Sequence, residues 1–243
     1  MKLRHFALLA SLPVVVAGPL RAADSTAQLL AKARAFLGSE SALNAVQTIR
    51  FTGTLEADAN TKLPIEIIFQ KPFEQRITVT SPKIIEVTAL DDYDAWQKRT
   101  NPANPAQWQV TLLDASQVKR LRANTWENLC FFAGLEKKGG NVQPGGEVTV
   151  DGVACVKLSF MHAPDIIFVR YFDKATGRLV KTETESHAEI REEGQLIVNG
   201  VRFPQKVINK APNGTTTTIV FDKVEVNPAV AASEFAVPTF RAN

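Results

Sequence analysis

Apolar and polar residues alternate along most of the chain beyond about residue 48. Short runs rich in Ile, Val, Phe and Thr are separated by Pro, Asn, Asp and Gly. A two-residue period of this kind predicts β-strands with one apolar face and one mixed face. We expect the first strand at 49–57 and the last at 215–226, with others at 147–150, 178–187 and 201–208 among them.

Tight turns join many of these runs. Asp151-Gly152 and Asn199-Gly200 each separate two apolar runs, and such pairs favour two-residue hairpin turns because both central residues need positive φ. No long connection interrupts the strands, so the sheet is expected to be antiparallel. We expect about ten or eleven strands, and a sheet of that size must curl or close.

One long stretch, 114–135, follows a helical period instead. Asp114 or Ser116 is placed to cap its start, and Gly134 to mark its end. Its apolar residues recur at three- and four-residue steps: Val118, Leu121, Trp126, Leu129, Cys130, Phe132 and Ala133. Such a stripe has to be buried against the sheet.

Two shorter helical segments precede the strands. A helix is expected at 26–37, capped by Asp24-Ser25 and stopped by Gly38, and a short turn follows at 41–46. The fold class is therefore mainly β (α+β). We expect a strongly curved antiparallel half-barrel, covered by the N-terminal helix and by 114–135 as a helical lid.

Residues 1–23 have the features of a secretory signal peptide. Lys2 and Arg4 precede an apolar stretch at 6–17, and small residues at 20–23 suit cleavage. The apolar stretch is too short for a membrane anchor, and no cysteine stands near the cleavage point. We expect a periplasmic protein that is not lipid-anchored, with 24–243 as a single domain.

Removal of this segment changes the charge balance. The full chain has 28 Lys and Arg against 25 Asp and Glu, and Lys2, Arg4 and Arg21 leave with the signal. The mature chain then has 25 of each sign, since 28 minus 3 is 25. Without a net positive charge, nucleic acid is not an expected partner.

The sequence offers little for catalysis. His162 and His187 stand alone, no metal-binding histidine or cysteine motif occurs, and no nucleophile can be matched with a base. The carboxylates at 91–94 are expected to form a turn rather than a calcium site. Cys130 and Cys155 either pair or remain separate buried thiols. We therefore expect no enzyme activity, no cofactor and no metal.

The apolar face of the sheet and the helical stripe have two interpretations: a filled core, or the lining of a cavity for an apolar ligand. Composition does not choose between them. In the second interpretation the lining residues are Ile67, Phe69, Ile77, Val79, Trp108, Val110, Trp126, Phe132, Leu158, Phe160, Ile167 and Val169.

Several short motifs, taken in order, resemble the periplasmic lipoprotein-sorting (LolA/LolB-like) superfamily, in particular its outer-membrane lipoprotein-sorting branch. They lie at 42–54, 69–73, 92–96, 171–179, 199–204 and 226–238. The resemblance implies an eleven-stranded half-barrel whose concave face takes up acyl chains of lipids or lipoproteins. It also implies inner- or outer-membrane partner proteins for a soluble carrier, which we expect to be a monomer.

In the carriers of this family an Arg-Pro pair at a strand end holds the lid closed. Here the corresponding pair is Lys71-Pro72, followed by Phe73, with Arg76 as a substitute for the missing guanidinium. The expected function is non-covalent transport of acyl chains. The alternative is an envelope protein-interaction or sensing module with a filled core and no lipid cargo.

Overall fold

The computed structural model describes residues 19–239, so the greater part of the expected signal peptide lies outside the described residues. The helices are α1 (Pro19–Leu37), α2 (Glu40–Ala45) and α3 (Ala115–Leu129). The first strands are β1 (Thr48–Glu56), β2 (Lys62–Gln70), β3 (Glu74–Thr80), β4 (Ile85–Asp91), β5 (Asp94–Asn101) and β6 (Asn104–Leu112). Those after α3 are β7 (Asn141–Val150), β8 (Val153–Ala163), β9 (Ile166–Asp173), β10 (Leu179–Thr184), β11 (Glu189–Glu193), β12 (Leu196–Val198), β13 (Val201–Phe203), β14 (Lys206–Lys210) and β15 (Thr216–Val226).

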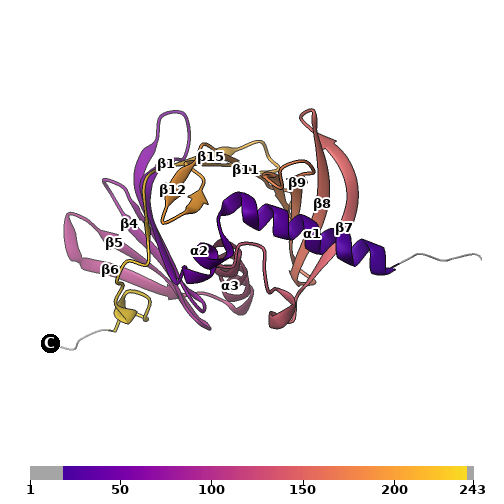
Figure 1. Cartoon of the computed structure of the whole chain (residues 1–243). Helices are drawn as coiled ribbons and strands as arrows, with labels where there is room; N and C mark the ends of the chain where they lie inside the picture. The colour runs from indigo at the N-terminus through magenta and orange to yellow at the C-terminus, as the bar shows by residue number, and fades with distance from the viewer. Residues whose placement is uncertain (1–18, 240–243) are drawn as a thin grey trace, which may run out of the picture.

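Within the described residues, thirteen of these strands form one antiparallel sheet in the order β6-β5-β4-β3-β2-β1-β15-β14-β11-β10-β9-β8-β7. The sheet is open, with β6 and β7 as its edges. The first and last strands pair at its middle, where Phe51 of β1 lies opposite Val224 of β15. In Figure 1 the sheet passes from β6, across β1 and β15, to β7, and the helices lie between its two ends.

The expectation of about eleven strands was wrong, because two of the expected runs were read incorrectly. The strand expected at 178–187 is β10, which ends at Thr184. The next strand, β11, was not predicted because its sequence is mostly charged. Run 201–208 is two strands, since Pro204 lies between β13 and β14 and cannot donate a ladder hydrogen bond. Strand β7 also begins six residues before the expected 147, at Asn141.

The short hairpin β12–β13 leaves the main sheet. β11 pairs directly with β14, and Gln205 N donates to Glu193 O over 3.1 Å at the base of the hairpin. Asn199 and Gly200 both have positive φ at its tip, as the sequence predicted. The tip contacts Gly38 after α1, where any Cβ would lie only 2.6 Å from Gly200 O. The hairpin therefore packs against α1 rather than in the sheet.

Helix α3 begins as predicted and ends earlier. Asp114 accepts from Gln117 N over 2.9 Å, and the Gln117 side chain accepts from Asp114 N over 3.0 Å, which forms a capping box. The helix ends at Leu129 instead of near Leu135, and Phe131 and Phe132 adopt positive φ. After this bend the two neighbouring rings lie in different core clusters.

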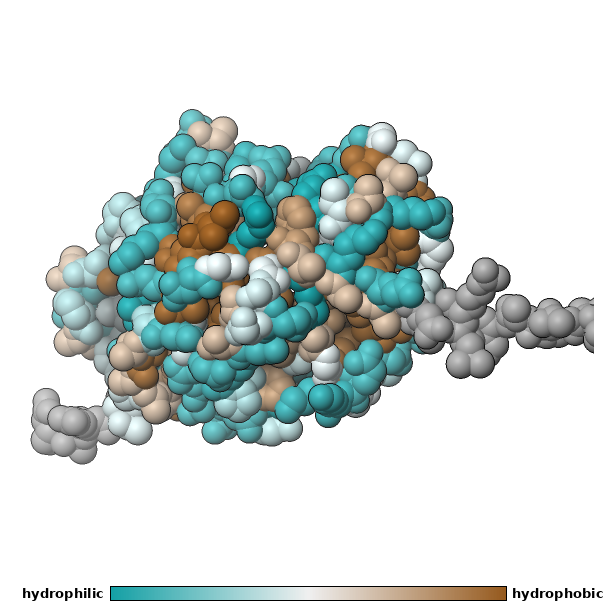
Figure 2. Space-filling model, viewed as in Figure 1, coloured by the Kyte–Doolittle hydropathy of each residue, from teal (hydrophilic) through white to brown (hydrophobic). Residues whose placement is uncertain are grey.

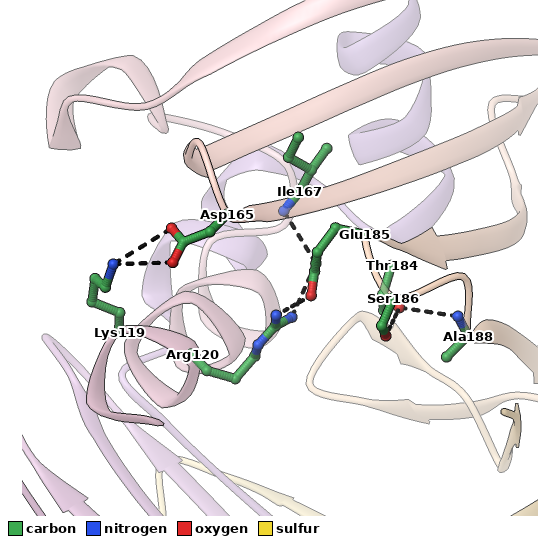
Figure 3. A network of polar contacts seen from close by, with 8 residues as sticks. All are labelled: Lys119, Arg120, Asp165, Ile167, Thr184, Glu185, Ser186 and Ala188. Atoms are coloured by element: carbon green, nitrogen blue, oxygen red, sulfur yellow. Dashed lines mark hydrogen bonds and ion pairs between the residues drawn. The ribbon is translucent and has the colours of Figure 1, made fainter. Parts of the chain in front are cut away.

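Ion pairs tie α3 to both halves of the sheet. Arg120 pairs with Glu185 after β10, and Lys119 with Asp165 before β9 over 3.2 Å (Figure 3). Arg122 pairs with Asp92 in the β4–β5 turn and donates to Asp92 O over 2.9 Å. The basic face of the helix thus binds acidic residues on both halves of the sheet.

Arg34 of α1 joins all three helices. Its guanidinium makes a two-point ion pair with Glu40 of α2, with N–O distances of 2.7 and 2.6 Å. The remaining Nη1 donates to the backbone oxygens of Cys130 and Phe131, over 3.0 and 2.8 Å. These carbonyls belong to the end of α3, where a cation is favourable for the helix dipole. Arg34 is only 7% exposed.

The N-terminal helix is longer than predicted. It starts at Pro19, a residue suited to the first helical position, instead of at Thr26. It ends at Leu37, before Gly38, as expected. Helix α2 covers the turn expected at 41–46, with Ser39 as its cap.

Replacing Arg34 by methionine should destabilise the protein by about 3 kcal/mol, because two buried carbonyls lose their donor. Urea unfolding measures the change. Arg99→Met is the control: Arg99 pairs with Glu86 but its side chain is 57% exposed, so a change of at most about 1 kcal/mol is expected. Equal losses in the two variants would contradict the role assigned to Arg34.

Candidate functional site

A cavity of about 720 Å³ lies between α3, the sheet, the β12–β13 hairpin and the end of α1. Its apolar lining consists of Phe36, Leu37, Phe51, Ile67, Phe69, Ile77, Phe131, Phe132, Phe168, Leu179, Ile190, Phe203, Pro204, Val207, Ile219 and Phe221. On the face seen in Figure 2, hydrophobic residues gather between the β1–β6 side of the sheet and α1. The volume lies within the range of about 300–1,000 Å³ typical of small-molecule sites.

Strand alternation builds the apolar wall. Phe51 of β1 lies opposite Ile67 of β2, and Ile67 opposite Ile77 of β3, so all three share one face. The Phe51 ring is the centre of this wall. It lies 4.6 Å from the Phe221 ring and 5.7 Å from the Phe203 ring, between centroids.

Charged residues form the other part of the lining. Glu127 of α3 pairs with Arg170 of β9, and Glu127 Oε1 lies 2.5 Å from His162 Nε2. The side chains of Glu127 and Arg170 are 4% and 8% exposed. The Arg170 guanidinium also stacks 4.8 Å from the Phe132 ring and 4.7 Å from the Phe160 ring. This buried pair separates the cavity from the core beneath it.

Glu192 of β11 enters the cavity from the opposite side. The residue as a whole is exposed and lines the cavity, whereas its carboxyl group is closely surrounded by protein atoms. Desolvation raises the pKa of its carboxyl above the ordinary value of 4.5, and the nearby positive charge of Arg170 partly opposes the rise. The cavity thus contains a carboxyl group that loses its proton at a higher pH than an ordinary glutamic acid does.

Four of the residues expected to bind a ligand lie around the cavity: Ile67, Phe69, Ile77 and Phe132. Trp126, Leu158 and Phe160 are buried with Phe132 in a second core cluster and do not line this cavity. Val79 packs against the cluster around Phe51 without lining the cavity.

The other four expected residues lie on the opposite face of the sheet. Val110 packs with Val87, Trp96 and Val237 there, and Trp108 follows the same alternation. Val169 packs with Tyr171 and Val180, and Ile167 alternates with it. In β9 it is Phe168 and Arg170 that line the cavity. Because β9 is apolar on both faces, its alternation does not identify the inner one.

The sequence reasoning missed Arg170 and Glu192. An arginine within the apolar run Ile166–Phe172 is a usable signal, since a charged residue is almost never fully buried unless it is paired. Glu192 gives no such signal, because it stands in a charged stretch.

The four expected lid contacts have different surroundings. Phe73 contacts α3 through Arg122, whose guanidinium lies 3.9 Å from the Phe73 ring centre. It also lines a second hollow of about 500 Å³, together with Trp126. Lys71 and Pro72 occupy the β2–β3 turn. Arg76 instead pairs with Glu66 and Glu234, over 3.5 and 3.2 Å.

The described residues contain no group of three or more potential metal ligands. Cys130 and Cys155 are both free thiols, and burial raises the pKa of each. Asp91 and Asp94 face each other across the β4–β5 turn, as the turn interpretation predicted. No helix between residues 19 and 239 has the length and apolar character needed to span a bilayer.

No protein-family model matches the chain, and no curated protein matches its sequence. Solved structures do. A LolA superfamily protein from Nitrosomonas europaea has a TM-score of 0.56 at 12% identity, covering 87% of this chain and 97% of its own. A domain described as an outer membrane lipoprotein-sorting protein, from Vibrio parahaemolyticus, has a TM-score of 0.54 at 9% identity, covering 88% and 96%.

A third structure, of a DUF1329 family protein from Desulfovibrio piger, has a TM-score of 0.52 at 11% identity and covers 86% of this chain and 96% of its own. At sequence identities this low, the similarity shows a shared fold and no more. The resemblance to LolA-like proteins that the sequence motifs indicated is therefore confirmed at the level of the fold.

The raised pKa of Glu192 gives a pH test. The folded protein holds this proton more tightly than the unfolded chain does. The bound proton therefore stabilises the folded state fully below pH 4.5, and this stabilisation is lost as the pH rises through the pKa of Glu192 in the folded state. Glu192→Gln should remove that loss, which makes the variant more stable than the wild type at neutral pH and leaves the two similar at pH 4.

Urea unfolding at a series of pH values measures this difference. Glu193→Gln removes one carboxylate from the same cavity and serves as the control for net charge. If Glu192→Gln has the same pH profile as the wild type, the assignment of Glu192 as a desolvated acid is wrong.

Proposed function

We propose that this protein binds one acyl chain or a similar apolar molecule non-covalently in the cavity of about 720 Å³ and carries it through the cell envelope. The observation that supports the proposal is the cavity itself. Its wall is a continuous surface of Phe, Ile, Leu and Val side chains between the sheet and α3. Each CH₂ transferred from water to such a surface contributes about 0.8 kcal/mol, so an alkyl chain needs no covalent link to be held.

The fold supports the same proposal. Two proteins that share it are named as a LolA superfamily protein and as an outer membrane lipoprotein-sorting protein domain. We extend the lipoprotein sorting stated in the second name to this chain only as part of the proposal. In it, the open sheet acts as a half-barrel around the ligand, with Ile67, Phe69, Ile77 and Phe132 among the contacts.

The proposal also assigns a location. The N-terminal segment 1–23 directs export to the periplasm, and 24–243 acts there as a single-domain, monomeric carrier without enzyme activity. Release to a membrane partner protein requires that the cavity opens or that the partner competes for the acyl chain. The segments that close the cavity opposite α3 are the end of α1 and the β12–β13 hairpin, which meet at Gly38 and Gly200.

The alternative, a protein-interaction module with a filled core, fits the structure less well. The cluster around Trp126 and Phe160 is filled, but the space on the other side of Phe132 is not. A module that binds only through its outer surface gives no reason for an apolar cavity of this size.

Filling the cavity should abolish binding. Ile219 of β15 lines the cavity and is only partly buried, so Ile219→Trp is expected to occupy the ligand's space without breaking the sheet. The affinity for a dansyl-labelled fatty acid should fall at least about tenfold, which corresponds to about 1.4 kcal/mol. Fluorescence titration measures it.

Ile84→Trp is the matched control. Ile84 precedes β4, is 44% exposed and does not line the cavity, so the same substitution there should leave the affinity unchanged. Circular dichroism confirms that both variants are folded. A wild-type protein that fails to bind the probe, or a folded Ile219→Trp variant that binds it normally, would refute the proposed function.

A further inference from the structure

The charged part of the cavity is built around Arg170. This side chain is 8% exposed, it lines the cavity, and its guanidinium stacks on Phe132 and Phe160. Neither Nε nor Nη1 donates a well-formed hydrogen bond to any described residue, although Nη1 is paired with Glu127. Both atoms are enclosed by protein, so a ligand meets this arginine only at the part of the side chain that lines the cavity, where its charge is little screened by water.

The charges around the cavity do not balance. Glu127 neutralises Arg170, and Glu193 pairs with Lys206 over 3.2 Å. Three charged residues of the lining remain, namely Arg178, Arg202 and Glu192. Arg202 donates to the neutral amide of Gln195 over 2.6 Å and so keeps its full charge. Two cations against one carboxylate leave the cavity with one positive charge in excess. Water screens the exposed Arg178, whereas the buried Arg170 is screened least, so an anion in the cavity is attracted most strongly at Arg170.

We propose that the ligand is a single-chain amphiphile with an anionic head, a carboxylate or a phosphate, and that this head binds at Arg170. The inference rests on the proposed function, because it names the chemical class of ligand for the same cavity. The alkyl chain lies against the wall around Phe51, and the head turns toward the Glu127–Arg170 pair. An ionised acceptor forms stronger hydrogen bonds with a guanidinium than a hydroxyl does.

Glu192 limits which head can bind. Its carboxyl faces the same arginine across the cavity, so a bound anion and an ionised Glu192 repel each other. A protonated Glu192 instead offers a hydrogen-bond donor to the head. Replacement of Glu192 by glutamine keeps a donor and removes the repulsion, and should therefore tighten the binding of an anionic amphiphile.

The test compares ligands that share one alkyl chain and differ only in the head: a fatty acid, the corresponding fatty alcohol and the corresponding alkyl phosphate. Each displaces the dansyl-labelled fatty acid from the wild-type protein at neutral pH. We expect the acid or the phosphate to bind at least tenfold more tightly than the alcohol. Whichever of the two binds more tightly identifies the head.

The variants locate the subsite. Glu127→Gln with Arg170→Gln removes the buried pair as a unit and so leaves no unpaired buried charge. The alcohol should bind this double variant as it binds the wild type, and the preference for the anion should fall to less than threefold. Arg178→Gln is the matched control, since Arg178 lines the same cavity but is exposed. It should keep most of the preference. Glu192→Gln should increase the preference.

The outcomes separate the two proposals. If the wild type binds none of the three ligands, the acid, the alcohol and the phosphate, the proposed function is refuted. Equal binding of all three refutes the head-group subsite and leaves the carrier function standing. If Arg178→Gln loses as much of the preference for the anion as the double variant does, the selectivity comes from the summed charge of the cavity and not from Arg170. That result also refutes the subsite. If the double variant does not fold, the comparison of the three ligands on the wild type and the effect of Glu192→Gln still test the head-group subsite.

Discussion

The arrangement of this protein depends on how the end of α3 is held. The helix stops at Leu129, and the backbone then bends so that Phe131 and Phe132 point in different directions. Bent backbone of this kind leaves carbonyl groups without helical partners, and in a buried position these must be satisfied. Arg34 meets that requirement from α1, and its pair with Glu40 fixes its own position. The three helices therefore form one unit, and the placement of both phenylalanines follows from it.

This unit divides the interior into two parts with different properties. On one side, Phe132 packs with Phe160 and Phe172 into a filled cluster. On the other, Phe131 joins the wall around Phe51, and space remains. The ion pairs of Arg120 and Arg122 hold α3 to strands from both halves of the sheet, so the division does not depend on either half alone. Under the proposed function, the joined helices are the fixed side of the cavity, and the β12–β13 hairpin is the side on which a ligand enters.

The charged part of the lining gives one side of the cavity a different character from the wall around Phe51. Glu127 and Arg170 are buried together, and a buried charge is costly unless it is paired. Glu192 and Arg178 face the same space from β11 and the β9–β10 turn. The amphiphile proposed as the ligand has an apolar part for the wall and a polar part for these charges.

The local pattern of the sequence was enough to predict the mainly β class, most hairpin turns, the start of α3 near Asp114 and the inner face of β2 and β3. Each depends on neighbouring residues: alternation, positive φ at Asn-Gly and Asp-Gly, or a side chain reaching three positions along. Where one strand face is clearly more apolar, as at Ile67 and Phe69, the pattern also identifies the cavity side.

The rest was decided by the tertiary structure. In β9 both faces carry apolar residues, so only pairing with the neighbouring strands decides that Phe168 and Arg170 point inward. In β6 the alternation is clear, but only the pairing with β5 decides that its apolar face, with Trp108 and Val110, is the outer one. The charged strand β11 exists because β10 and β14 lie on either side of it. Arg34 reaches carbonyls 96 and 97 positions away. No local pattern encodes a contact over that separation, because its partner is defined only when the chain has folded.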